Sequence, residues 1–505
     1  MKLANQILMS FRQCFARQAA HTWFVIATLT FILRREKYGV TDSIRCFGLP
    51  EKCYESVLHF YKADSWSIYQ LSNNWGQIVF EQDEVYRIDG KCALIIDGIK
   101  VSKEGRRMPA NKKLHQESEN SNKAEYIFGH MHGAVGLAVG NDEKLFSVPI
   151  STRIHDGMNT ILGWQQESTE DTDQEQRDEK TDKKKIELPK HPSKMIKQAH
   201  EVLTASDEDE AFCVGDNYFH GRPALQALNE LNEKSKQKLI LVTRAKSTAV
   251  AYEDPPPRIK GTRGRPKEKG DTIQLKRLFD TRAQEFTTAT IDMYGKKEDV
   301  KYLVVEKLWG QNCKKLGFVS QKLRFVLVKY KGKRTILVCT DLTVDALSII
   351  KLYSIRFKIE CSFKCLKHDI GAFDYHFWSF STPRLNRYSK KTDPDPLEDI
   401  TSERARQNII KTIKAYEMYM LCGCIALGIL QLNSLQLHNE VGSQKFGYKR
   451  THSSGYASEA TMKNILSETI FELLIRGAKI PIINLISAKI KGKKSEYSTF
   501  ELDVA

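Results

Sequence analysis

The stretch "CALIIDGIK", residues 92–100, divides the sequence into two parts with different patterns. Before it, residues 1–88 carry apolar side chains at helical spacing, with breaks at "YGVTD" and "FGLPEK". The stretch itself is a short apolar run that ends in Asp97, which predicts a buried strand ending at a carboxylate. After it, "AVGLAVGNDEKLFSVPISTRI" predicts two strands joined by a polar turn at Asn141 and Asp142. The chain is therefore predicted to pass from helices to a sheet here, in an α/β protein.

A second apolar run, "AFCVGD", also ends in an acidic residue, Asp216. It is followed by a predicted helix, "GRPALQALNELNEK", and by a predicted strand, "KLILVTRAK". The segment 165–190 before this run contains "QQESTEDTDQEQRDEKTDKKK", which has almost no apolar side chains and predicts a charged, flexible connection. The sequence thus places two acidic residues after two apolar strands, one on each side of that connection.

Most of the positive charge of the chain lies in one segment. The whole sequence has a net charge of +16 and a pI near 9.1. Residues 244–340 contain 23 Lys and Arg against 10 Asp and Glu, a net charge of +13, and include strand-like runs such as "VKYLVVEKLW" and "RFVLVKY". A basic surface concentrated in this way favours binding to a polyanion, of which nucleic acid is the first to test.

Composition narrows the class of protein further. A chain of 505 residues with 41% hydrophobic residues is long enough for several packed domains. The uninterrupted apolar runs are shorter than the roughly 18 residues that a membrane span needs, and the N-terminus does not resemble a cleavable signal. The 11 cysteines contain no CxxC pair. We therefore expect reduced thiols in a cytoplasmic protein, without a structural zinc site and without contact to a membrane.

The stretch "YSIRFKIECSFKCLK", residues 353–367, carries the third acidic residue in an ordered pattern. At about 100° per residue in an α-helix, its polar side chains share one narrow stripe. An apolar seam lies directly beside that stripe on the same wheel. The stripe consists of Tyr353, Arg356, Glu360 and Lys367, and the seam of Leu352, Ile359, Phe363 and Leu366.

Each acidic residue alone has an ordinary interpretation, because Asp after a strand is common in turns and a helical Glu is usually solvated. Asp97, Asp216 and Glu360 together predict a different role. Carboxylates at strand ends and on a packed helix can converge on one point, where cations must neutralise them. Hard oxygen ligands of this kind suit Mg²⁺, which activates a nucleophile and stabilises the leaving oxygen in phosphodiester cleavage.

The pattern Y-x2-R-x3-E-x6-K, together with "LIIDGIK", "FCVGDNYF" and "LILVTRAK", resembles DDE transposases of the insertion-sequence family-four type, over roughly residues 90–435. The resemblance implies a ribonuclease H-like core with a β-rich insertion between the second Asp and the Glu. It implies that Asp97, Asp216 and Glu360 hold Mg²⁺ ions, with Mn²⁺ as a substitute. The implied activity is cut-and-paste transposition of a bacterial insertion sequence, by cleavage at terminal inverted repeats and strand transfer. The implied partners are double-stranded DNA and a second copy of the chain, at the nucleoid.

Several further residues are candidates for DNA contacts. Tyr353, Arg356 and Lys367 are expected at phosphates near the scissile bond, together with Arg244. "TRGRPKEKG" resembles an AT-hook core in Arg263, Arg265 and Lys267, and a flexible loop that contacts phosphates is the alternative. Trp309 is a candidate to stack on a flipped base, and a buried sheet Trp is the alternative.

The expected organisation has five parts. An α/β, ribonuclease H-like core with a β-rich insertion is flanked by helical N- and C-terminal regions: 1–88 binds DNA, 89–245 and 341–435 form the core, 246–340 is the insertion, and 436–505 is the C-terminal region. The rhythm of "VTDSIRCFGLPEKCYESVLHFY" fits either a helix-turn-helix or an ordinary helical hairpin. Two other functions fit the same sequence: a metal-dependent nuclease without strand transfer, and an inactive transposase-derived regulator that binds DNA.

Overall fold

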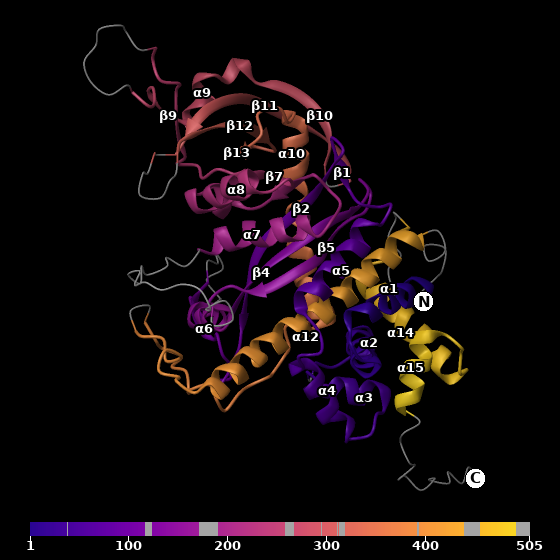
Figure 1. The fold of residues 1–505 in the computed structure, drawn as a ribbon. Coiled ribbons are helices and arrows are strands. Elements are labelled where there is room, and N and C mark those ends of the chain that lie inside the picture. Colours follow the sequence, from indigo (N-terminus) through magenta and orange to yellow (C-terminus); the bar gives the residue numbers. More distant parts are fainter. Residues whose placement is uncertain are drawn as a thin grey trace.

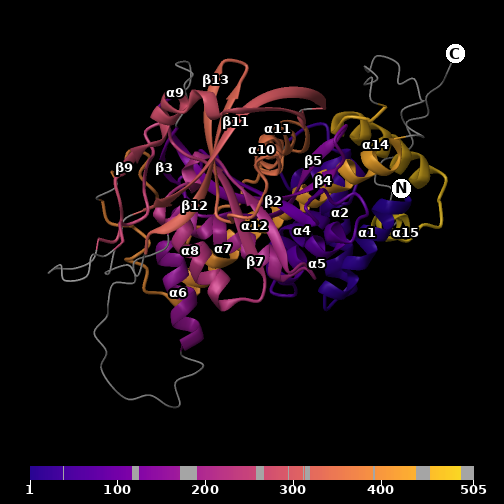
Figure 2. The ribbon, with the colours of Figure 1, turned by 90° about the horizontal axis from the view of Figure 1, so that it is seen from above.

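The structure is a computed structural model, and it describes residues 1–37, 39–116, 124–170, 190–257, 267–293, 295–310, 312, 319–390, 393–438 and 455–490. It has a mixed α/β architecture around one large sheet, with helices on both faces (Figures 1 and 2). The prediction of an α/β fold is confirmed at this level.

Five strands form the part of the sheet that carries the candidate site. In spatial order they are β5 (Leu145–Ile154), β4 (Tyr126–Gly140), β2 (Lys91–Ser102), β6 (Glu210–Val214) and β7 (Lys238–Arg244). β4 is antiparallel to both of its neighbours, whereas β2, β6 and β7 are parallel to one another. The predicted strands and the turn at Asn141 are confirmed, since Asn141 Oδ1 accepts bonds from two backbone N–H groups in that turn.

The basic segment continues the same sheet. β13 (Lys333–Cys339) is antiparallel to β7 and is followed outward by β12 (Gln321–Tyr330) and β11 (Lys296–Trp309). The smaller strands are β10 (Thr287–Met293), β8 (Val250–Tyr252) and β9 (Thr272–Gln274) here, and β1 (Arg87–Ile88) and β3 (Lys112–His115) next to the core strands. The β-rich segment is thus joined to the core by backbone hydrogen bonds and not only by its linkers.

Different helices cover the two faces. α7 (His191–Thr204) and α8 (Arg222–Lys234) pack on β2, β4, β6 and β7. On the opposite side, α11 (Lys358–Cys365) and α12 (Glu403–Gln436) pack on β5 (Figure 2). The other helices of this half are α6 (Asn159–Glu170), α9 (Leu278–Thr281) and α10 (Ala346–Ile355).

The two ends of the chain form a helical layer against α12. This layer contains α1 (Lys2–Ser10), α2 (Gln18–Leu33), α3 (Thr41–Phe47), α4 (Cys53–Lys62), α5 (Ile68–Phe80), α14 (Glu459–Ile475) and α15 (Pro481–Ile490). α2 is buried on nearly all sides and contacts α12, α14 and α15. α3 and α4 are joined through Gly48 at φ 56°, so the helix, turn and helix predicted here are present, and a DNA-binding role for them stays a prediction.

α12 explains the apolar run "MYMLCGCIALGIL". Among the described residues it is the one helix long and apolar enough to cross a membrane, and its apolar window is completely buried inside the protein. The sequence argument counted only the uninterrupted apolar run and therefore underestimated the length of this helix. Gly428 and Gly423 allow close packing, as expected, because a Cβ would overlap the ring of Trp75 at the first and the Cβ of Ala372 at the second.

Candidate active site

Asp97 lies where the central sheet begins to split. The sequence predicted that the strand ends at Asp97, which is wrong, because β2 continues five residues further to Ser102. The parallel pairing with β6, however, ends at Ile95, opposite Val214. Beyond that point β2 is bonded to β4 alone, so the Asp97 side chain stands beside the end of β6.

Asp216 follows that strand end directly. It comes two residues after β6 and begins the short 3-10 turn Asn217–Phe219, where its Oδ1 accepts a hydrogen bond of 2.9 Å from the Tyr218 N–H. The Thr243 hydroxyl, on β7, donates to the Asp216 carbonyl and holds this turn against the sheet. Since β2 and β6 are adjacent and parallel, Asp97 and Asp216 meet at one edge, as predicted.

Glu360 is carried by a broken helix rather than by one straight helix. α10 ends at Ile355, Arg356 and Phe357 form a turn, and α11 begins at Lys358. Across the break the backbone bonds shorten to three residues, as in Glu360 N to Phe357 O at 3.0 Å. The prediction of one regular helix is therefore wrong, although Arg356 and Glu360 still contact each other and Tyr353 lies next to Arg356, as expected of one stripe.

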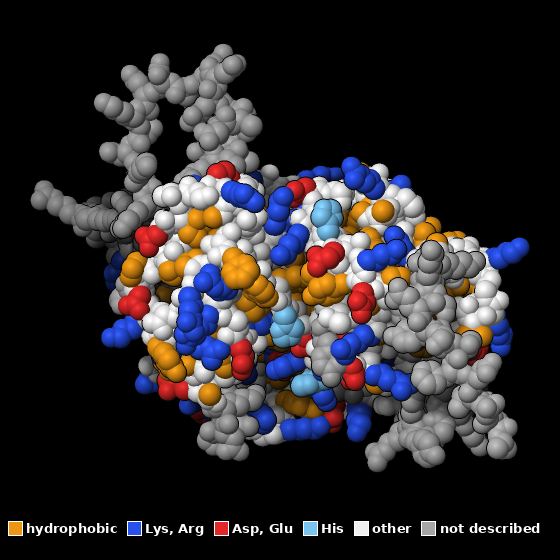
Figure 3. All heavy atoms as spheres, turned by 90° about the horizontal axis from the view of Figure 1, so that it is seen from below, with side chains coloured by type: hydrophobic (Ala, Val, Ile, Leu, Met, Phe, Trp, Pro, Cys, Tyr) orange, Lys and Arg blue, Asp and Glu red, His pale blue; other side chains and the backbone are white. Residues whose placement is uncertain are grey.

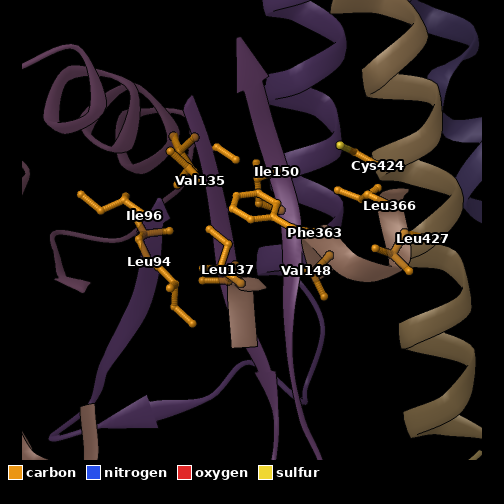
Figure 4. Packing of buried hydrophobic residues seen from close by; sticks show 14 of the residues in the cluster. Leu94, Ile96, Val135, Leu137, Val148, Ile150, Phe363, Leu366, Cys424 and Leu427 are labelled. Carbon is orange, nitrogen blue, oxygen red and sulfur yellow. The ribbon is translucent and has the colours of Figure 1, made fainter. Parts of the chain in front are cut away.

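The apolar seam beside the stripe is confirmed. Leu352, Ile359, Phe363 and Leu366 are all buried. Figure 4 shows Phe363 and Leu366 packed between the strands and α12, close to Val148, Ile150 and Leu427. This burial fixes the helix that carries Glu360 against β5.

Arg356 links the first and third carboxylates. Its Nη1 lies 3.4 Å from Asp97 Oδ2, and its Nη2 donates to Glu360 Oε1. The side chains of Arg356 and Asp97 are only 18% and 20% exposed, whereas that of Glu360 is 55% exposed. A guanidinium therefore supplies the positive charge between these carboxylates in this structure.

The electrostatics show that the acidic groups are crowded. Burial, followed by the nearby charge of Asp216, raises the pKa of Asp97 to about 7, while the Gly98 N–H and Arg356 act against this rise. Burial also raises the pKa of Tyr353, against the charges of Arg244 and Arg356, which lower it. Three carboxylates, two cations and a phenol thus lie within electrostatic reach of one another.

Lys367 is placed differently from the other residues of the pattern. It lies in the π-helical turn Leu366–Ile370 that follows α11, and its side chain is exposed. In the part of the chain that the structure describes, that side chain forms no hydrogen bond or ion pair with Asp97, Asp216 or Glu360. The end of this turn is held from the N-terminal layer by the buried Arg34, which donates from Nε to the Ile370 carbonyl at 2.8 Å.

The other predicted DNA contacts divide into three groups. Arg244 ends β7, is exposed and lies near Tyr353, so it belongs to the site. Trp309 ends β11 half-buried, with its ring 4.6 Å from the ring of His220, in the segment after Asp216. Lys267 is exposed, while Arg263 and Arg265 lie outside the described residues.

The donor set can be compared with the chemistry of Mg²⁺. Three carboxylates on one edge are the hard oxygen ligands that this ion prefers. Within the described ranges, no group of three or more His, Cys, Asp or Glu side chains is arranged to hold a metal ion. The three carboxylates are thus the right type of ligand for Mg²⁺. In this structure, however, the Arg356 guanidinium lies between Asp97 and Glu360, where the ion would bind.

Sequence reasoning missed the residues that shape this edge. A Cβ at Gly98 would overlap Met131 and lie 2.9 Å from His191 Nε2, and a Cβ at Gly215 would lie 2.5 Å from the Phe219 ring. Each glycine therefore permits close packing beside an acidic residue. The Asp-Gly and Gly-Asp pairs were visible in the sequence and were the available signal.

Comparisons with known proteins add little to this geometry. No protein-family model matches the chain, and no curated protein matches it. Among solved structures, the chain is similar to a piggyBac transposase in a synaptic complex with hairpin DNA, with 12% identity, over 99% of this chain and 84% of that one. The TM-score of 0.34 is too low to establish a shared fold.

Proposed function

We propose that this protein is a DNA transposase that cleaves the ends of its own element and joins them to target DNA. The observation that carries the proposal is the convergence of Asp97 and Asp216 at one sheet edge, with Glu360 tied to the same point through Arg356. Three carboxylates with a single buried arginine leave a net negative charge in one place, which is costly unless further cations balance it.

The strand arrangement supports a ribonuclease H-like core. The antiparallel strands β5, β4 and β2 are extended by the parallel strands β6 and β7, and the first two acidic residues lie on the adjacent strands β2 and β6. The basic segment 246–340 is inserted between Asp216 and Glu360, as the resemblance to the family-four type requires. We therefore include the ribonuclease H-like core and the family-four type in the proposal.

In this proposal Asp97, Asp216 and Glu360 hold Mg²⁺, or Mn²⁺ in its place. The bound ion supplies activation of a water or a 3′-hydroxyl and stabilisation of the leaving oxygen. The chain itself positions the DNA: Arg356 and Arg244 neutralise backbone phosphates, since a guanidinium pairs with phosphate as well as with carboxylate.

The Tyr353 hydroxyl, which has a raised pKa and so stays protonated, donates to a phosphate oxygen.

The insertion contributes a basic surface for DNA, because its ion pairs use up only part of its positive charge. Six pairs, such as Lys322 with Asp254 and Arg334 with Asp280, occupy six of the ten acidic residues in 244–340 and leave most cations outside these pairs. The substrate is double-stranded DNA with terminal inverted repeats, and the active assembly is a homodimer at the nucleoid of a bacterial cytoplasm.

The test uses purified full-length protein, Mg²⁺ and linear DNA that carries the inverted repeats found beside the gene. We expect cleavage at the ends and joined products. Glu360→Gln should abolish cleavage and retain end binding, whereas Glu468→Gln, an exposed carboxylate on α14, should cleave normally.

Other outcomes select the alternatives. Tight end binding without cleavage in any metal would identify a DNA-binding regulator. Cleavage without preference for ends and without joining would identify a nuclease. Full cleavage by the Glu360→Gln variant would remove Glu360 from the site.

A further inference from the structure

The segment between the π-helical turn and α12 exposes an unusual set of aromatic rings. We call residues 373–390 the strap; it contains no helix or strand and lies at the lower left of Figure 1, beside the start of α12. Trp378, Phe380 and Tyr388 are 51%, 77% and 78% exposed. Large aromatic side chains left in water on one segment indicate a binding surface.

The strap carries buried aromatic side chains first and exposed ones after them. Phe373, Tyr375 and Phe377 are buried, whereas Trp378 and Phe380 point outward. The inward row fastens the strap to the core, for example through the ring of Tyr375, which stacks on that of Tyr416 at 4.6 Å. The outward row is therefore held in place by the inward row.

A buried lysine forms the first anchor of the strap. Lys103, next to the end of β2, is 6% exposed and donates to the carbonyls of Phe373 and Tyr375, the latter at 3.0 Å. Its ammonium also lies 3.7 Å from the centre of the Tyr375 ring. Lys103 is therefore a buried structural cation and not a free surface charge.

The backbone beyond Lys103 forms further anchors. Ser379 N donates to Arg107 O at 3.1 Å, and Leu385 N donates to Arg106 O at 2.9 Å. The Arg107 guanidinium returns two bonds, to Phe380 O at 3.1 Å and Thr382 O at 3.0 Å. The strap is thus attached along its length to the chain that leaves β2, and its exposed rings stand on a fixed backbone.

The exposed rings lie among positive charges. Trp378 and Phe380 touch edge to face with ring centres 4.6 Å apart, and the Arg107 guanidinium lies 5.8 Å from the Phe380 ring. The strap contains Arg384, Arg387 and Lys390 and a single acidic residue, Asp374. Figure 3 shows Lys and Arg side chains interspersed with exposed hydrophobic ones on the lower face of the molecule.

We propose that the strap binds nucleic acid whose bases are unpaired. Rings of Trp378 and Phe380 stack on bases, with Tyr388 as a further ring, while Arg384 and Arg387 contact phosphates. A basic surface with exposed aromatic rings is the combination by which proteins hold single strands, because every base has a face that can stack. A protein partner of ordinary charge would gain little from the cations, whereas a polyanion gains from both features.

The strap is attached to the strand that carries Asp97. From Asp97 to the end of β2 at Ser102 the strand covers about 17 Å at roughly 3.3 Å per residue, and Lys103, the first anchor of the strap, follows at once. The strap therefore begins on the same rigid strand as the first of the three carboxylates. This placement extends the proposed function, but binding by the strap can be measured without any cleavage.

The experiment compares a single strand with a duplex of the same sequence by fluorescence anisotropy, with full-length protein and without metal. We expect the variant carrying Trp378→Ala and Phe380→Ala to bind the single strand about tenfold more weakly for each ring removed, with duplex binding unchanged. The single variant Trp378→Phe, which keeps an aromatic ring at this position, should retain most of the wild-type affinity for the single strand. Phe471→Ala, which removes an exposed ring on α14, should change neither affinity.

Three results would overturn the proposal. Equal losses for single strand and duplex would mean that the rings do not stack on unpaired bases. Unchanged single-strand affinity would remove the rings from any nucleic-acid contact. A change in oligomeric state of the double variant, measured by sedimentation, would assign the strap to a second copy of the chain. Failure of DNA cleavage would refute the proposed transposase and leave this binding result standing.

Discussion

Replacement of Asp97 by Asn gives the sharpest test of how the site is assembled. Burial, together with the charge of Asp216, raises the pKa of the Asp97 carboxyl to about 7. Because its pKa in the folded chain lies above that in the unfolded chain, the protonated group favours folding. That contribution is complete below the unfolded pKa near 4 and is lost as the pH rises through about 7.

The size of the effect follows from these two values. With a side chain that is 20% exposed, the Asp97 carboxylate should reduce the free energy of unfolding by about 2 to 3 kcal/mol more near pH 8 than near pH 5. Asp97→Asn removes the titrating group, so the variant should gain stability over the wild type by this amount between the two pH values.

The assay is denaturant unfolding of wild type and variant across that pH range, without DNA and with metal chelated. Comparison of the two proteins at each pH cancels the titration of all groups they share. Asp207→Asn, which changes an exposed carboxylate away from the site, serves as the matched control and should show no such dependence. A constant difference between wild type and Asp97→Asn at every pH would refute the reasoning.

Two neighbouring variants give the sign of each contribution. Asp216→Asn removes a negative charge that raises the pKa of Asp97, so the pH dependence should move to lower pH. Arg356→Gln removes a positive charge that lowers this pKa, so the dependence should move to higher pH. The opposite order would show that the charges are not arranged as the structure places them.

Three further predictions concern packing, the buried ion pair and the metal. Gly428→Ala should destabilise the protein by about 1 to 3 kcal/mol, because the new methyl meets the rigid Trp75 ring, while Gly163→Ala, in open space on α6, should stabilise it by about 0.5 to 1 kcal/mol; thermal unfolding measures both. Arg34→Met should cost about 3 to 5 kcal/mol in the same assay, because it removes the buried guanidinium that pairs with the Asp42 carboxylate at 3.1 Å. Mg²⁺ at about 100 times its dissociation constant should stabilise the wild type by about 2.7 kcal/mol, and the Asp97→Asn variant much less; thermal unfolding followed by calorimetry measures both.

Local pattern was enough to predict much of this molecule. The alternation and the apolar runs around Asp97 and Asp216 predicted the strands and their order along the chain, because side-chain period depends only on local backbone geometry. The seam of Leu352, Ile359 and Phe363 predicted which face of the motif is buried for the same reason.

Properties that depend on distant contacts could not be predicted in this way. The break at Arg356 lies inside a pattern that reads as continuous helix, and the Arg356 side chain reaches Asp97, 259 residues away in sequence. Burial of Lys103 likewise depends on carbonyls of the strap some 270 residues later. Neither contact is visible in the local pattern of charge and polarity.

The sequence by itself determined the elements, the two acidic strand ends, the apolar seam and the concentration of basic charge in 244–340. Only the tertiary structure decided that β2 continues past Asp97, that an arginine separates two of the three carboxylates, and that a basic aromatic strap is fastened to the chain that leaves β2. The reason is physical: periodicity and composition are properties of neighbouring residues, whereas the pKa of a carboxyl and the exposure of a ring depend on what the rest of the chain packs against them.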